Sequence, residues 1–248
     1  MIQNQNQEFE TSEMWEDTPY VSTHHTTADA QELLGKVATK SFMVTFIGLI
    51  ITTVAAFLTV SNLGFMFELI WSGAYTFLLI AELVVVLINS WAISKNNLGL
   101  AAVLFGVYSI LNGITLSVVL FAAEIGTVQD AFLAAAIIFG VMAAYGYFSK
   151  KDLSSIGSIC TMGLMGVIVV SLLNALIFKS SGMDLVVDYI VVLLFVGITA
   201  FDMYRMKQMA LDGGEEEVNR IALFTGMQLY LDFINLFLRL IRIMGKKR

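Results

Sequence analysis

The sequence predicts an all-α, polytopic membrane protein with seven transmembrane helices. Of the 248 residues, 58% are hydrophobic and 14% are charged, whereas a soluble domain has about 45–50% apolar and about 25% charged residues. Seven apolar runs are close to the roughly 20 residues that cross a bilayer, and short connections join them. This composition excludes an ordinary soluble enzyme, and it excludes a nucleic-acid-binding protein, which needs a basic face.

The first 35 residues differ from the rest of the chain. They contain seven of the twenty acidic residues, the only proline (Pro19), and no Lys or Arg before Lys36. They lack the basic start and apolar stretch of a signal peptide. We expect residues 1–35 to be an acidic, disordered cytoplasmic tail and residues 36–248 to form the seven-helix transmembrane domain.

Each apolar run predicts one membrane-spanning helix. In chain order the runs are 41–60, 69–93, 98–123, 131–148, 156–178, 185–204 and 221–244. The fourth run has no charge and many Ala and Gly residues, which is typical of a helix that packs closely against its neighbours. The fifth contains Cys160, the only cysteine, so no disulfide can form within the chain. Because no run contains proline, no proline kink is expected.

The distribution of basic residues predicts that the N-terminus is cytoplasmic. Loops on the opposite side carry only Lys179. Eight basic residues lie on the N-terminal side: Lys36, Lys40, Lys95, Lys150, Lys151, Arg205, Lys207 and Arg220. A re-entrant last helix would keep the basic C-terminus on the N-terminal side, but the run 221–244 is long enough to cross fully, and we expect it to do so. Lys246, Lys247 and Arg248 then lie outside, against the positive-inside rule.

The last span carries a stripe of polar residues. At about 100° per residue, its polar side chains fall on an arc of roughly 100°, and the other side is apolar. The members of the stripe are Thr225, Gln228, Asp232, Asn235, Arg239 and Arg242. Such a stripe must face protein or water rather than lipid. It can be a hydrogen-bonded seam between helices, but we favour the lining of a pathway, because a seam needs fewer polar groups.

Asp202 and Asp232 are candidates for a carboxyl pair. They lie on consecutive spans, which are expected to be antiparallel neighbours, although the predicted boundaries put them about 10 Å apart in depth. Carboxyl groups that touch in a medium of low dielectric constant share a proton. The pair could then act as a pH-sensitive latch between two helices and as a calcium site. In the alternative interpretation, Asp202 only caps its span near the headgroups, beside Arg205.

Glu82 lies in the middle of the second predicted span. An ionisable side chain costs at least about 2.5–3.5 kcal/mol at the bilayer centre, so Glu82 needs a partner. Arg239 and Arg242 are the only basic residues inside a span, and we expect one of them to pair with it. The polar residues of the third span, Tyr108, Asn112 and Thr115, are more typical of contacts between helices.

Two segments resemble the Bax inhibitor-1 family. The stretch LYLDFINLFLRLIRI at 229–243 is similar to the last helix of that family, and VGITAFDMYRM at 196–206 is similar to its penultimate helix. The resemblance covers about residues 36–246. It implies a bundle in which the last helix is central and wrapped by the other six. The similarity to bacterial members also implies a location in the plasma (inner) membrane.

The resemblance implies roles for several residues. In members of the family, two aspartates at the positions of Asp202 and Asp232 sense pH, and members are associated with pH-sensitive calcium leak. Glu82 matches the glutamate of the second span, and Arg242 matches a basic position in the last helix. Some members have an arginine eleven residues after that glutamate which latches the aspartates. This chain has Ile93 there.

The main functional hypothesis is a pH-sensitive calcium leak channel gated by Asp202 and Asp232, with Glu82, Gln228, Asn235, Arg239 and Arg242 as pathway or latch residues. The two aspartates would also contact the calcium ion. A second hypothesis is a regulator without transport activity that binds another membrane complex, such as a membrane protease. An intramembrane aspartyl protease is a remote third, because Leu-Tyr-Leu rather than Gly-x-Gly precedes Asp232. We therefore expect no enzymatic activity and no cofactor. The expected partners are the lipid bilayer, calcium and another membrane protein, and we expect no binding to nucleic acid.

Overall fold

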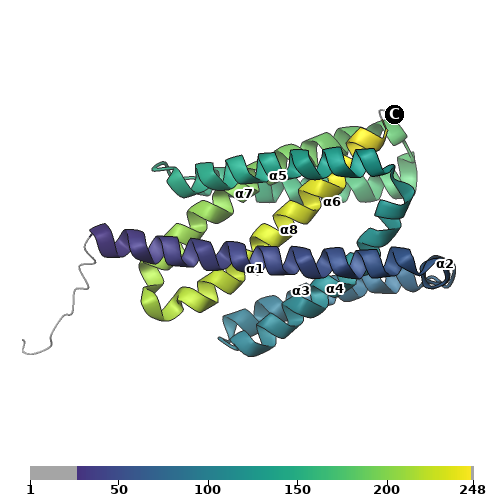
Figure 1. Cartoon of the computed structure of the whole chain (residues 1–248). Coiled ribbons are helices and arrows are strands. Elements are labelled where there is room, and N and C mark those ends of the chain that lie inside the picture. Colours follow the sequence, from purple (N-terminus) through teal and green to yellow (C-terminus); the bar gives the residue numbers. More distant parts are fainter. Residues whose placement is uncertain (1–26, 247–248) are drawn as a thin grey trace, which may run out of the picture.

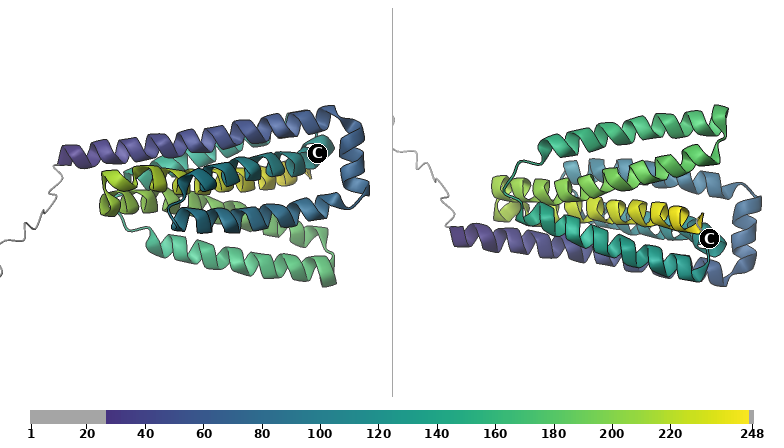
Figure 2. Two further views of the ribbon diagram at one scale, coloured as in Figure 1. Left: turned by 90° about the horizontal axis from the view of Figure 1, so that it is seen from below. Right: turned by 90° about the horizontal axis from the view of Figure 1, so that it is seen from above.

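The computed structural model describes residues 27–246, which form a bundle of long, nearly antiparallel helices (Figure 1). Seven helices in this part of the chain are long and apolar enough to cross a membrane, and no strand is present in it. The predicted all-α fold with seven membrane-spanning helices is therefore confirmed. Figure 2 shows that the start of α1 lies at one end of the bundle and the end of α8 at the other, so α8 runs the full length of the bundle. We call these ends the N-side and the C-side.

The helices follow one another with short connections. Their bounds are α1 Thr27–Ser61, α2 Leu63–Trp71, α3 Ala74–Ser94, α4 Leu98–Ala122, α5 Ile125–Phe148, α6 Ser154–Leu173 with a π-helical turn at Asn174–Phe178, α7 Ser181–Gly213, a 3-10 turn at Glu215–Glu217, and α8 Val218–Gly245. The helix α1 begins inside the predicted acidic tail, so residues 27–35 are helical rather than disordered. Residues 1–26 of that tail lie outside the described residues.

The short helix α2 was not predicted from the sequence. It crosses the C-side end of the bundle between α1 and α3 (Figure 2). The Asn62 side chain caps it by accepting a hydrogen bond from the backbone N–H of Phe65, at 3.1 Å. Gly73, with φ of 75°, then turns the chain into α3. The predicted span 69–93 was wrong at its start, because one apolar run supplies parts of two helices.

The turn between α7 and α8 sets the positions of the candidate site residues. The helix α7 continues nine residues past the predicted end at 204, to Gly213, and Gly214 leaves it with φ of 64°. Such a conformation favours glycine and ends a helix sharply. One 3-10 turn later, α8 begins at Val218. The end of α7 and the start of α8 therefore lie close together at the N-side.

The last helix, α8, is the core of the bundle. It packs mainly against α1, α7 and α5, and 67% of its most apolar window is buried, the highest share of any span. The central place expected for the last helix is confirmed, but the wrapping is incomplete. The helix α6 packs on α7 instead, and α3 packs mainly on α4. Between α3 and α7, one edge of α8 stays only partly covered.

Candidate functional site: a buried carboxyl pair between α7 and α8

The carboxyl groups of Asp202 on α7 and Asp232 on α8 lie within hydrogen-bonding reach of each other. Both residues are buried, with 6% and 3% of their surface exposed. The hydroxyl of Thr199, one turn before Asp202, also lies against Asp232. The structure therefore brings together the two aspartates that the sequence singled out, and Asp202 is buried between helices rather than exposed at the end of its helix.

The two aspartates meet because they lie at nearly the same depth. Asp202 lies eleven residues before the end of α7 at Gly213, and Asp232 lies fourteen residues after the start of α8 at Val218. At 1.5 Å per residue, this difference is about 4.5 Å of helix rise. The offset of about 10 Å expected from the sequence was wrong, because the predicted span ended at 204 while the helix continues.

Few donors serve this carboxyl pair. Within residues 27–246, the Oδ2 atom of Asp232 is buried and accepts no hydrogen bond. The positive charge that acts on Asp202 is that of Arg205, one turn further along α7. The Arg205 guanidinium lies 5.1 Å from the centre of the Phe224 ring of α8, in a cation–π contact. The pair is thus shielded from water but has a cation nearby.

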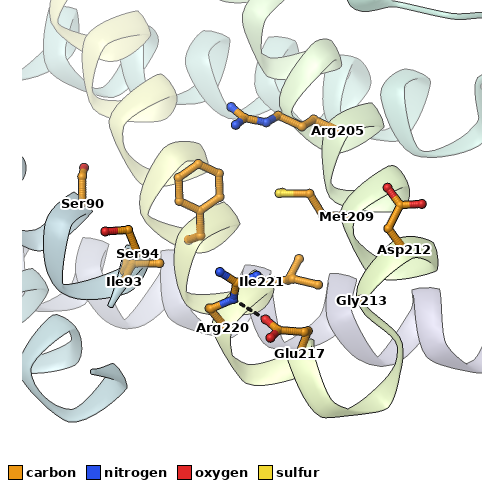
Figure 3. Close-up of a pocket in the computed structure, with 11 residues that line it drawn as sticks. Ser90, Ile93, Ser94, Arg205, Met209, Asp212, Gly213, Glu217, Arg220 and Ile221 are labelled. Atoms are coloured by element: carbon orange, nitrogen blue, oxygen red, sulfur yellow. Dashed lines mark hydrogen bonds and ion pairs between the residues drawn. The ribbon is translucent and has the colours of Figure 1, made fainter. Parts of the chain in front are cut away.

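A cavity of about 560 Å³ lies on the N-side of the pair. Figure 3 shows Arg205 and Met209 of α7 on one side, Ser90 and Ser94 of α3 on the other, and α8 between them. Ile93, at the position where some members of the Bax inhibitor-1 family have arginine, adds an apolar side chain to the lining. Two cationic side chains line this cavity, Arg205 of α7 and Arg220 of α8.

The polar stripe of α8 divides into a buried part and an open part. Thr225 and Asp232 face the core, whereas Gln228, Asn235 and Arg239 are only partly buried, on the edge between α3 and α7. The Asn235 amide donates to the carbonyl of Leu231 at 2.8 Å. The stripe therefore leads from the carboxyl pair along the uncovered edge of α8.

The arginines of α8 pair with Asp188 of α7, which the sequence analysis missed. Its side chain is 1% exposed, and its Oδ1 atom lies 2.8 Å from Arg239 and 3.4 Å from Arg242. Asp188 lies fourteen residues before Asp202, almost four helical turns, so both residues fall on the same face of α7. That spacing was the signal that could have identified it.

Glu82 does not pair with either arginine, so this prediction was wrong. It accepts hydrogen bonds from the Thr115 hydroxyl at 2.5 Å and the Asn112 amide at 3.4 Å, both on α4. Asn112 in turn accepts from the Tyr230 hydroxyl of α8 at 3.1 Å. Because α3 packs mainly on α4, this network is what links Glu82 to α8.

The described residues contain no group of three or more His, Cys, Asp or Glu side chains arranged to hold a metal ion. Calcium takes six to eight oxygen ligands, and Asp202, Asp232 and Thr199 together supply fewer. The arrangement does not suit a resident calcium ion.

The fold and this site define a multi-pass α-helical membrane protein with a buried carboxyl pair beside its central helix. The family model "Inhibitor of apoptosis-promoting Bax1" matches residues 34–248, and the chain belongs to the Bax inhibitor-1 family. It is 35% identical to the inner membrane protein YbhL of Escherichia coli over 210 residues, which are 82% of this chain and 88% of YbhL. It is 36% identical to a protein of Borreliella burgdorferi, with 90% and 97% of the two chains covered.

Proposed function

We propose that this protein is a pH-sensitive cation leak channel for calcium, gated by Asp202 and Asp232. The observation that carries the proposal is the contact between these two buried carboxyl groups on adjacent helices. Two carboxylates in contact cannot both ionise cheaply at low dielectric constant. A shared proton would also supply the donor that Asp232 Oδ2 lacks.

The shared proton would latch α7 to α8. While the pair holds a proton, a hydrogen bond joins the helices. When both groups ionise, their repulsion pushes the helices apart unless a cation lies between them. Loss of the proton would therefore open the α7–α8 seam and create an oxygen-rich site for a divalent cation at the same time.

The surroundings of the pair support a route on both sides of the latch. The cavity beside Arg205 leads towards the pair from the N-side, which we expect to be cytoplasmic. Gln228, Asn235 and Arg239 continue along the open edge of α8 towards the C-side. Polar groups along an incompletely covered helix are typical of a water-filled path rather than a lipid-facing surface.

The test is calcium flux into liposomes, measured as the pH is raised from acidic to alkaline. We expect the wild-type flux to rise as the pair loses its proton. Asp232→Asn should give a low flux that does not vary with pH, because the amide can donate to Asp202 at any pH. Equal leak from wild type and Asp232→Asn at every pH would contradict the gating mechanism.

A matched control is Asp152→Asn. Asp152 lies in the loop before α6, and hydrogen bonds from the hydroxyl and the backbone N–H of Ser154 hold its pKa below the usual value. It is therefore already ionised where the buried pair is expected to titrate. The control variant should keep the wild-type pH profile of calcium flux. If its profile changed as well, the pH dependence would reflect altered surface charge rather than the latch.

A further inference from the structure

A second cavity opens on the side of α8 that faces away from α7. It measures about 520 Å³ and lies between α1 and α4 on one side and α5 on the other, with α8 behind it. The helices α1 and α5 make no extended contact with each other in the described part of the chain. Figure 1 shows α8 passing behind α1 and α5 at this place. Phe57 of α1 and Ile125 of α5 line the cavity and are 70% and 75% exposed, so the cavity reaches the outer surface of the bundle between these helices.

The length of the cavity matches half of a bilayer. Along α1 it runs from Leu49 to Val60, eleven residues or about 16 Å of helix. The hydrocarbon core of a bilayer is about 30 Å thick, so one leaflet occupies about 15 Å. Val60 adjoins the C-side end of α1, and Ile125 is the first residue of α5. The cavity therefore extends from the C-side interface to about the middle of the membrane.

The lining of the cavity suits a hydrocarbon chain rather than water. Most of it is aliphatic or aromatic. The Thr52 hydroxyl already shares a hydrogen bond with Tyr230 at 2.6 Å, and the Thr53 hydroxyl donates to the Leu49 carbonyl at 2.7 Å. A buried water typically needs two to four polar partners, which these groups do not supply. Near the C-side end of the cavity, the exposed amide of Gln129, one turn into α5, is the polar group available to a lipid ester.

We propose that this cavity binds one acyl chain of a phospholipid from the C-side leaflet. The chain would enter between α1 and α5 and lie against Phe233, Ile234 and Phe237 of α8. Phe233 directly follows Asp232, so the bound chain supports the helix of the carboxyl pair from its opposite side. The binding itself does not depend on ion transport.

Photo-crosslinking in liposomes tests this proposal. The liposomes contain phosphatidylethanolamine and phosphatidylglycerol with a trace of phosphatidylcholine that carries a diazirine in its acyl chain. Phe233 and Phe237 are each only 5% exposed, so a lipid at the outer surface of the bundle cannot reach them. We expect labelled residues in the stretch 233–237 of α8, in addition to the exposed surface of α6.

Filling the cavity should abolish the α8 label. Thr53→Trp and Val128→Trp place indole rings on facing walls, while Val54→Trp is the matched control, because Val54 is 52% exposed and does not line the cavity. The label should be lost in the first two variants and kept in the control, with unfolding temperatures confirming that each variant folds. Unlabelled α8 in wild type, or a label insensitive to Thr53→Trp, would overturn the proposal.

A diazirine fatty acid provides the second arm of the experiment. If only the free fatty acid labels 233–237 and the phospholipid does not, the assignment to a phospholipid is wrong. Because crosslinking requires no flux, a positive result would stand even if the leak channel were disproved. Conversely, normal flux in Thr53→Trp without the label would leave the gating proposal intact.

Discussion

At the scale of single residues, the partners in the Asp188 ion pairs differ in exposure. This difference determines which substitution lowers the stability of the protein more. Asp188 is 1% exposed, whereas the Arg239 and Arg242 side chains are 27% and 49% exposed. An arginine that loses its partner here can extend towards water, since long basic side chains snorkel to the interface. The buried carboxylate cannot, so removing the arginines should destabilise the protein more than removing Asp188.

A double-mutant comparison tests this asymmetry. Replacing both Arg239 and Arg242 by Gln should lower the free energy of unfolding by about 3–5 kcal/mol, as expected when a buried charge loses its partners. Asp188→Asn alone should have a smaller effect. Adding Asp188→Asn to the double variant should recover most of the loss. Thermal unfolding in detergent measures all three, and a triple variant less stable than the double would contradict the assignment.

The sequence identified some of these residues and missed others for a physical reason. Asp202, Asp232 and Glu82 are visible because each interrupts an apolar run, where an ionisable group requires an explanation. The hydropathy pattern does not show which helices pack side by side, however, so the sequence could not show that Glu82 faces α4. Asp188 escaped notice because it lies near the beginning of a predicted span, where a charge is unremarkable in sequence.

At the scale of helices, α5 and α7 depend on one glycine for their close contact. A Cβ atom added to Gly146 of α5 would overlap the backbone carbonyl of Ala200 on α7. Backbone atoms cannot move aside as a flexible side chain can. Because Ala200 lies two residues before Asp202, this contact also fixes the height and rotation of α7 at the carboxyl pair.

Gly146→Ala should therefore destabilise the bundle, by about 1–3 kcal/mol if it resembles other overpacked sites. The matched control is Gly140→Ala on the same helix, where an added Cβ would meet open space. That change should leave stability equal or raise it by up to about 1 kcal/mol, because alanine is the better helix former. Equal melting temperatures for the two variants would refute the close-contact explanation.

The ends of the helices were less predictable than their existence. The hydropathy pattern placed the end of the sixth span at 204, because the charged residues Arg205, Lys207 and Asp212 follow. Backbone hydrogen bonding nevertheless continues α7 to Gly213. The apolar pattern marks the bilayer, whereas the helix ends where its hydrogen bonds end. The close approach of Asp202 and Asp232 depends on those extra turns, so its geometry could not be obtained from hydropathy alone.

At the scale of the whole molecule, α8 runs the full length of the bundle, so the start of α1 and the end of α8 lie at opposite ends (Figure 2). Residue 27 lies on the N-side, together with the loop between α5 and α6. Lys246 follows α8 on the C-side, where its ammonium donates to the carbonyl of Ser181. If the N-side is cytoplasmic, as the basic loops predict, this topology places Lys246 on the side that the positive-inside rule disfavours.

Cysteine labelling tests this topology. The native Cys160 is free and is first replaced by Ser. In that background, a membrane-impermeant thiol reagent added to intact cells should label Lys246→Cys at once and Lys151→Cys only after permeabilisation. Labelling of both positions under the same condition would contradict a full crossing of α8, and the opposite order would reverse the predicted cytoplasmic N-terminus.

The ion pairs of Asp188 also bear on how the chain is built. Translation begins at the N-terminus, so α7 emerges from the ribosome before α8 and carries Asp188 to the membrane first. Arg239 and Arg242 then arrive on a segment whose unaided insertion would be opposed by its positive charges. The Asp188 carboxylate offers them a counter-charge, so we expect α7 and α8 to enter the bilayer as one hairpin rather than as two independent segments.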